Sequence, residues 1–488
     1  MQVLSIFNLF KSSKSNFYFG IVATIAVAYG LFLNMIKPGD IDIDSAICGA
    51  VANKNSSQGG LYISAWENKP PALIYLLQGL MFFSQNKVYI FFSLALFSAI
   101  FLALGIYFLV YKYVQSVTVA IILCTFSFGV IIQPHFYGYG LYTELFCAIF
   151  LVYALVFYEY PSIKNHIYIA AIFAGFSFWF KEPCLLAAMS ILGLLITKNK
   201  QKSVQFKLLF YFFLPSIYFI LLLMLNGSLI AFIKTIQYNF AYINTQERAS
   251  LFKKLFDFRT SFIYPSIFLI LALLMLFYWL LKKKKLNVEH LFFTLITLSS
   301  SLFFILSPYF FGHYYLTFVI MFFVLVGKFY ESYKLSVKFT NSLFIAICFY
   351  LTYLSINHYV KPQFTYKIHD YQPDNITKKL IAEPNKTLFV DYAYAVEYLI
   401  KSNNIHHAFL PVPLSVHFNE TPLGIKNRER IWYEMNHPKA DFLITTHTTS
   451  YFYWSLPNHY FYEEFYEKID SIHKKDDNVM YLWQLKKK

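Results

Sequence analysis

The chain has 488 residues, of which 58% are hydrophobic and only 14% are charged. Charged residues make up about a quarter of an ordinary globular chain, so this composition cannot cover a water-soluble fold. It excludes the disordered, collagen-like, coiled-coil and small disulfide-rich classes, and it predicts a polytopic membrane protein. The net charge of +15 falls almost entirely in the predicted inner loops. That is the positive-inside pattern of membrane proteins and not a nucleic-acid footprint.

The apolar stretches predict an α-helical protein with about 11 transmembrane helices, because about 20 apolar residues cross the hydrocarbon core of a bilayer. Lysine-rich breaks fall at alternate ends of these stretches, which places the N-terminus in the cytoplasm and, after an odd number of spans, the C-terminus outside. The predicted spans are 16–36, 88–111, 116–134, 145–158, 167–180, 183–197, 206–226, 261–281, 291–312, 314–327 and 339–357.

One further apolar segment, 72–83, is too short to span and directly follows Pro70 and Pro71. Counting it as a span would invert the side of every later lysine cluster. We therefore predict a re-entrant or interfacial helix on the outer side for this segment.

The composition changes after residue 358, where charged residues become frequent and the apolar stretches shorten. Alternating short strands and helices predict a small α/β domain outside the membrane. The chain is thus divided into a transmembrane domain at 1–358, with an outer loop at 37–87, and an extracytoplasmic α/β domain at 359–488. The predicted elements of the tail are strands at 387–391, 407–411, 441–446 and 479–485, and helices at 394–402 and 428–435.

The cysteines form neither a CxxC pair nor a Cys/His metal spacing, and most of them lie in apolar runs, where cysteine behaves as a small hydrophobic residue. We therefore predict no disulfide framework and no metal site, while a divalent cation as cofactor stays open. The five cysteines are Cys48, Cys124, Cys147, Cys184 and Cys348.

Ionisable side chains near hydrocarbon are costly, so their positions are informative. Glu144, Lys181 and His313 each lie at the predicted outer end of a short span. No comparable acidic cluster is expected on the inner side. Charges at helix ends also snorkel or cap helices, but the gathering of the whole set on one side favours a functional site at the outer boundary. The outer loop contributes the remaining charged candidates, Asp42, Asp44, Glu67 and Lys69.

The first outer loop carries the most specific pattern. Asp44 follows the first span, a Gly-x-x-Tyr motif ends at Tyr62, and Lys69 begins a Lys-Pro-Pro motif. Together these motifs resemble the C-type glycosyltransferases (GT-C), in the branch of the protein O-mannosyltransferases and the lipid A aminoarabinose transferases. Thr143-Glu144, the Phe-Lys-Glu-Pro turn at Lys181 and His313-Tyr314-Tyr315 are similar to later polar positions of that family. The sequence departs from the family at Ser45, where a Glu is frequent, and at Cys48, where a Tyr is frequent.

The resemblance implies a GT-C-like fold and an integral-membrane glycosyltransferase. Such an enzyme takes a sugar from a polyprenyl-phosphate donor in the bilayer and transfers it, with inversion, to an acceptor hydroxyl on the extracytoplasmic side. The acceptor is a lipid, a glycan or a protein. The Lys-, Asn- and Phe-rich composition suggests a bacterial inner membrane. A lipid-linked saccharide ligase and a flippase or transporter are the alternatives, and a transporter would place charges near the middle of spans in two matching halves.

Under this hypothesis each candidate has a role. Asp44 is the catalytic base, because partial desolvation makes a carboxylate more basic, and Glu144 orients the acceptor or the sugar. Lys69 stabilises the departing phosphate. The remaining residues assigned to the binding of substrate or phosphate are Lys181, His313, Tyr62 and Asp42.

Overall fold

The structure is a computed structural model, and it describes residues 14–35, 41–58, 60–84, 86–131, 140–245, 263–282, 288–306, 312–333, 374–390, 397–402, 405–406, 426, 429, 440–446, 465–473 and 479–486. The chain divides into two compact units. Unit 1 comprises residues 1–37, 94–218 and 248–368, and unit 2 comprises 38–93, 219–247 and 369–488. This division does not follow a single boundary at residue 358, because the outer loop and residues 219–247 group with the tail.

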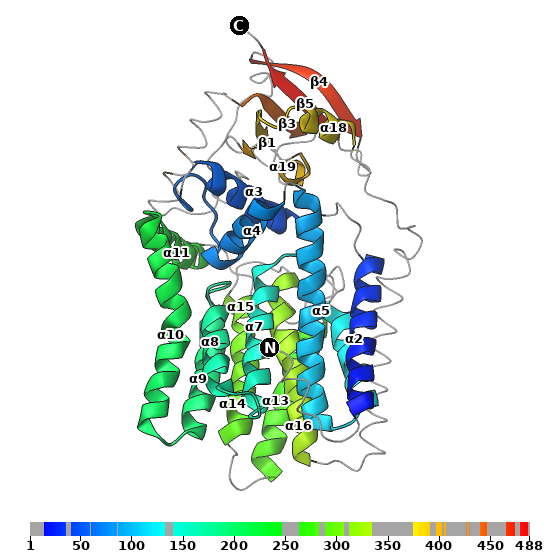
Figure 1. Cartoon of the computed structure of the whole chain (residues 1–488), viewed down its shortest axis with the longest axis vertical. Helices are drawn as coiled ribbons and strands as arrows, with labels where there is room; N and C mark the ends of the chain where they lie inside the picture. The colour runs from blue at the N-terminus through cyan, green and yellow to red at the C-terminus, as the bar shows by residue number, and fades with distance from the viewer. Residues whose placement is uncertain are drawn as a thin grey trace. The chain divides into compact units, whose positions relative to one another are not determined.

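Unit 1 consists of helices that run side by side (Figure 1). Helix α7 packs on α8, α9 and α16, and α14 packs on α9 and α16. Every residue of α16 from Leu316 to Val326 is buried, so this helix lies in the core of the unit. The helices are α2 (Lys14–Met35), α5 (Lys87–Val114, mostly in this unit), α6 (Val117–Ile131), α7 (Thr143–Glu159), α8 (His166–Ser177), α9 (Cys184–Lys198), α10 (Lys202–Leu225, mostly in this unit), α13 (Ile263–Lys282), α14 (Val288–Ser300), α15 (Leu302–Leu306), the 3-10 helix η3 (Gly312–Tyr315) and α16 (Leu316–Tyr333).

Several helices have the length and composition of membrane spans. Within the described residues, four are long and apolar enough to cross a membrane: Asn16–Leu33, Lys87–Val114, Lys202–Leu225 and His313–Glu331. Six further apolar helices are shorter. The chain is therefore a helical membrane protein, although the predicted number of 11 spans is not reached by this measure. The predicted span 339–357 lies outside the described residues.

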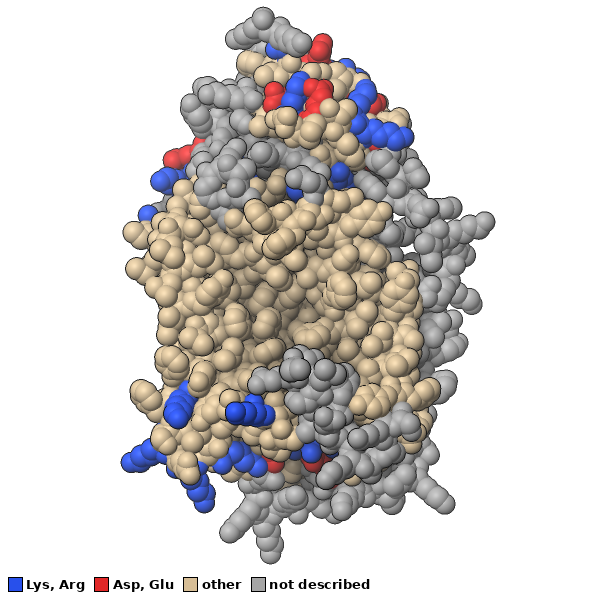
Figure 2. Space-filling model, in the orientation of Figure 1, with Lys and Arg blue, Asp and Glu red and all other residues tan. Residues whose placement is uncertain are grey.

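The surface of these helices supports the same conclusion. Among the described residues, none in the middle of the face shown in Figure 2 is Lys, Arg, Asp or Glu, whereas blue Lys and Arg side chains gather below it. Large apolar side chains of α10 such as Phe206, Phe210 and Phe213 are exposed. A helix satisfies all its backbone hydrogen bonds internally, so an apolar outer face of this kind is suited to lipid.

Unit 2 combines helices from residues 38–93 and 219–247 with a mixed sheet and two short helices of the tail. Helix α3 (Ile43–Gln58) packs on α4 (Pro71–Phe83), on α19 (Glu397–Lys401) and on strand β2 (Ile405–His406). The sheet has the order β2-β1-β3-β5-β4, parallel from β2 to β3 and antiparallel from β3 to β4. Its other members are β1 (Thr387–Val390), β3 (Phe442–Thr446), β4 (Tyr466–His473) and β5 (Val479–Leu485), and the remaining helices are α11 (Leu229–Thr245) and α18 (Asn375–Ala382).

The sheet confirms the predicted strands at 387–391, 441–446 and 479–485 within one residue. The predicted helix at 394–402 is present as the shorter α19. Strand β4 and helix α18 were not predicted, and the predicted strand at 407–411 lies outside the described residues, directly after β2. The predicted helix at 428–435 lies almost wholly outside them as well.

The segment predicted as a short helix after the double proline is α4. Pro70 is its N-cap residue and Pro71 its first helical residue. Proline is favoured at this position because its fixed φ suits the helix and because its missing N–H would have no partner there. The helix is confirmed, while its place at the membrane surface stays a prediction.

Candidate functional site

The seven predicted site residues fall into two clusters, one in each unit. The first is built on the start of α3. The carboxylate of Asp42 accepts a hydrogen bond from the Ser45 backbone N–H at 2.9 Å, and the Ser45 hydroxyl also donates to it. This is helix capping, and it places Asp44 in the first turn, where the helix dipole favours a carboxylate. Asp42, which we assigned to substrate binding, is therefore engaged in starting the helix.

Lys69 joins the two carboxylates of this first cluster, which we call the Asp44 cluster (Asp44, Glu67 and Lys69). Its Nζ lies 3.1 Å from Asp44 Oδ1 and 3.6 Å from Glu67 Oε1. The side chains of Lys69 and Glu67 are 11% and 5% exposed, whereas that of Asp44 is 31% exposed. In this cluster the Asp44 carboxylate is partly exposed to solvent, and the Lys69 ammonium that pairs with it is buried.

The pKa values of Lys69 and Glu67 in the Asp44 cluster depend on the neighbouring charges. Burial alone would lower the pKa of Lys69, but the carboxylates of Asp44 and Glu67 outweigh it and raise that pKa well above its ordinary value. Burial raises the pKa of Glu67, and the neighbouring ammonium of Lys69 opposes this shift. Lys69 is thus a cation at neutral pH, and its charge favours the ionised form of the buried Glu67 carboxylate against the effect of burial.

The position of Lys69 is fixed by Tyr62. Tyr62 has a positive φ of 64°, and its backbone N–H donates to the Ala65 carbonyl in a tight turn. Its hydroxyl donates to the Lys69 carbonyl at 2.7 Å. The side chain is almost fully buried and its ring lies 5.7 Å from that of Phe232. We assigned Tyr62 to substrate binding; in the structure the residue is 3% exposed and its hydroxyl supports the Lys69 backbone.

A helix that sequence reasoning missed holds the same loop. The indole N–H of Trp66 donates to Thr235 Oγ1 of α11 at 3.0 Å. The Asn239 side-chain amide donates to the Asn68 carbonyl at 2.7 Å. Helical periodicity is the signal that could have revealed α11, because its apolar and polar residues alternate at helical spacing. Phe232, Thr235 and Tyr238 are buried at a spacing of three residues, whereas the polar Lys234 and Gln237 are exposed.

The loop also depends on the close approach of Gly60. A Cβ atom at this position would lie 2.6 Å from both the Asn226 backbone carbonyl oxygen and the Ser228 hydroxyl. We expect Gly60→Ala to displace the loop and to cost about 1–3 kcal/mol of stability. Gly79→Ala is the matched control, because Gly79 is an exposed helical residue with nothing within 4 Å of such a Cβ, and it should not destabilise. Thermal melting of the two purified variants in detergent tests this, and equal melting temperatures would contradict it.

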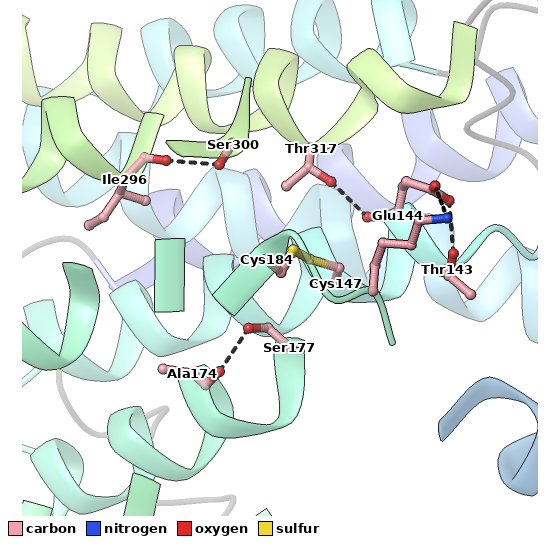
Figure 3. The surroundings of a disulfide bond; sticks show 10 residues. Thr143, Glu144, Cys147, Ala174, Ser177, Cys184, Ile296, Ser300 and Thr317 are labelled. Atoms are coloured by element: carbon pink, nitrogen blue, oxygen red, sulfur yellow. Dashed lines mark hydrogen bonds and ion pairs between the residues drawn. A yellow bond between two sulfur atoms is a disulfide. The ribbon is translucent and has the colours of Figure 1, made fainter. Parts of the chain in front are cut away.

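The second cluster, in unit 1, is built on the start of α7. Lys181 Nζ lies 3.1 Å from Glu144 Oε1, and the side chains of the two residues are 17% and 1% exposed. The Thr143 hydroxyl donates to the other Glu144 carboxylate oxygen at 3.0 Å (Figure 3). Glu144 is therefore an almost fully buried carboxylate paired with a nearby cation.

The η3 segment completes this second cluster. The His313 ring stacks on that of Tyr142 with 4.5 Å between the centroids. The Lys181 ammonium lies over the Tyr314 ring, 5.4 Å from its centroid. Glu144, Lys181 and His313 thus come together from three separate segments, and we call them the Glu144 cluster.

A disulfide lies beside the Glu144 cluster, and this corrects the prediction that none is formed. Cys147 of α7 and Cys184 of α9 are joined across 6.7 Å between their Cα atoms (Figure 3). They are separated by 37 residues and lie in apolar runs, so no spacing pattern marks them as partners. Cys48 and Cys124 are buried free thiols.

Carboxylates also gather at the other end of α7, which corrects the expectation that acids gather at one end only. Lys328 of α16 is 5% exposed at its side chain and lies 3.2 Å from Glu159, 3.4 Å from Glu289 and 2.7 Å from Glu331. The hydroxyl of Tyr113 donates to Glu159 as well. These contacts connect the ends of α7 and α16 with the start of α14.

Within the described part of the chain, no three His, Cys, Asp or Glu side chains are grouped so that they could hold a metal ion. No protein-family model and no curated protein matches the chain. The likeness to the C-type glycosyltransferases therefore depends on the motifs quoted above and stays a prediction.

Proposed function

We propose that the protein is an integral-membrane glycosyltransferase that moves a sugar from a polyprenyl-phosphate donor to an acceptor hydroxyl, on the extracytoplasmic side of a bacterial inner membrane. The observation that carries the proposal is the Asp44 cluster, in which a partly exposed carboxylate is paired with a buried lysine. The apolar helices support it too, because a lipid-linked donor must be held by a protein that resides in the bilayer.

Asp44 takes the proton in this mechanism. The acceptor hydroxyl oxygen attacks the anomeric carbon of the sugar while the bond from that carbon to the phosphate oxygen breaks. The hydroxyl proton passes to the Asp44 carboxylate, and the bonding electron pair leaves with the polyprenyl phosphate. A single displacement of this kind inverts the configuration at the anomeric carbon.

Lys69 stabilises the charge that develops on the departing phosphate. A fixed cation lowers the barrier only if it is charged and held in place before the reaction. Both conditions are met, since the neighbouring carboxylates raise the pKa of Lys69 and the hydrogen bond from Tyr62 fixes its backbone. In the same proposal Glu144 orients the sugar or the acceptor, and Lys181 and His313 assist in stabilising the departing phosphate.

The direct test is an assay of the full-length protein, purified in detergent, with a panel of polyprenyl-phosphate sugars and acceptor extracts from its own cells. Release of polyprenyl phosphate together with a labelled, glycosylated product is the expected result. Parallel reactions with EDTA and with Mg²⁺ test the open question of a divalent cation. If no sugar is transferred but the protein moves a labelled lipid-linked saccharide across vesicle membranes, the transporter alternative replaces the proposal.

A further inference from the structure

Two bridges join the same pair of segments in unit 1. The ion pair connects Glu144 to Lys181, and the disulfide connects Cys147 to Cys184. Each cysteine follows the ionic residue of its segment by three positions, which is nearly one helical turn. The two bridges therefore lie next to each other, one turn apart along α7.

Lys181 is not part of a helix. It lies in the turn between α8 and α9, where the Phe180 N–H donates to the Ser177 carbonyl and the Cys184 N–H donates to the Lys181 carbonyl. These are short-range turn hydrogen bonds, which restrain a backbone less than the ladder of a helix does. The place of Lys181 relative to α7 thus depends on contacts that cross between the two segments.

Contacts of this kind surround the ion pair. The Phe180 ring stacks on the rings of Phe146 and Phe150 of α7, with 5.3 and 5.1 Å between the centroids. The disulfide is a further contact, and its two cysteines are both completely buried. Only the disulfide is covalent, so it sets the separation of the segments most strictly.

We infer that the Cys147–Cys184 disulfide is a positioning element that holds Lys181 against Glu144, and that this end of α7 faces an oxidising compartment. Disulfides persist in the bacterial periplasm and are reduced in the cytosol. The ion pair is buried, so a small displacement of Lys181 would leave the carboxylate of Glu144 without compensation. The inference deepens the proposed function by adding positioning residues to the Glu144 cluster, but its tests need no transferase activity.

The first test counts thiols in cells. Cells are lysed in denaturant with N-ethylmaleimide, so that buried free thiols are blocked as well, and the protein is then reduced and labelled with a maleimide-polyethylene glycol. We expect two of the five cysteines to be labelled only after reduction, and Cys147→Ala to abolish both labels. If all five are blocked before reduction, or if Cys147→Ala retains both labels, the inference is wrong.

The second test asks whether the two bridges are coupled. Lys181→Met leaves a buried carboxylate unpaired and is expected to lower the melting temperature by about 3 °C or more. In the Cys147→Ala/Cys184→Ala background the same change should cost less than half of that shift, because the ion pair is already loosened. Lys328→Met, at the other end of α7, is the control and should cost the same in both backgrounds. Equal costs of Lys181→Met in the two backgrounds would overturn the positioning role.

A reciprocal measurement needs no cysteine variant and so covers the case in which the double variant fails to fold. Coupling between two bridges acts in both directions. The dithiothreitol concentration that half-reduces the disulfide should therefore be at least twofold lower in Lys181→Met than in the unmodified protein or in Lys328→Met. Identical midpoints in all three proteins would also overturn the inference. Neither outcome touches the proposed sugar transfer, which is tested by the donor assay.

Discussion

Replacing Asp44 with Asn is expected to reduce sugar transfer at least 100-fold, because a positioned general base contributes about 10²–10⁴ to such a rate. The amide of Asn has nearly the shape of the carboxylate, and its oxygen can still accept a hydrogen bond from Lys69. What it lacks is the capacity to take the proton of the acceptor hydroxyl. The measurement is the initial rate of transfer with a polyprenyl-phosphate sugar that the unmodified protein accepts.

Asp42→Asn is the matched control for this variant, because Asp42 lies two residues upstream and its carboxylate caps α3. Asn is as good an N-cap as Asp, so we expect the transfer rate to stay within a few-fold and the fold to persist. A fully active Asp44→Asn protein would remove Asp44 from the mechanism. Equal losses in both variants, with matching losses of thermal stability, would show that Asp44 acts only through the fold.

The sequence predicted those features that depend on residues close together in the chain. Apolar stretches predicted the helices of unit 1 because a span must be uniformly apolar over its length. The alternation of α and β elements predicted three strands of the sheet. Strand β4 was not predicted, because its residues do not form an apolar pattern. It is an edge strand with exposed Glu467 and Lys468, and its pairing with β5 shifts register before Asp470.

The sequence was less informative where a side chain has a choice of partners. Asp42 and Tyr62 carry groups that suit substrate binding, yet both are used by nearby backbone, at Ser45 and at the Lys69 carbonyl. The hydrogen bond from Trp66 to Thr235 joins residues 169 positions apart, and no sequence motif predicts it. Pairings of this kind follow from tertiary packing, which sequence periodicity does not encode.

The two charged ends of α7 explain why this helix looks short in the sequence. Glu144 and Glu159 are separated by 15 positions, or about 22 Å along a helix. Glu144 is buried and Glu159 is 10% exposed at its side chain, and each is paired with a lysine, Lys181 at one end and Lys328 at the other. Lys328 is no candidate site residue in the sequence, yet its side chain is only 5% exposed. The charged pairs at both ends are therefore contacts inside the helical unit, and the apolar stretch between them is shorter than the ~30 Å hydrocarbon core.

The largest loss of stability is expected from Lys69→Met, which removes the cation shared by Asp44 and Glu67. Breaking a buried ion pair from one side typically costs about 3–5 kcal/mol, because an uncompensated buried charge is left behind. Removal of the fixed cation should abolish transfer as well. Thermal melting in detergent measures the stability change. Lys198→Met is the control, since Lys198 is 45% exposed in its pair with Glu289 and should cost at most about 1 kcal/mol.

The pH dependence identifies which charge is responsible for that loss. Burial already raises the pKa of Glu67 while Lys69 opposes the shift, so Lys69→Met should raise this pKa further. A carboxyl group whose pKa is higher in the folded than in the unfolded state stabilises the fold when protonated, and it loses this contribution as the pH rises through the folded pKa. The melting temperature of Lys69→Met should therefore recover as the pH falls from about 7.5 towards the ordinary Glu range near 4.3, and more steeply than that of the unmodified protein. Adding Glu67→Gln should restore part of the stability at neutral pH and flatten the curve. Parallel curves for all three proteins would show that Glu67 is not the group left uncompensated.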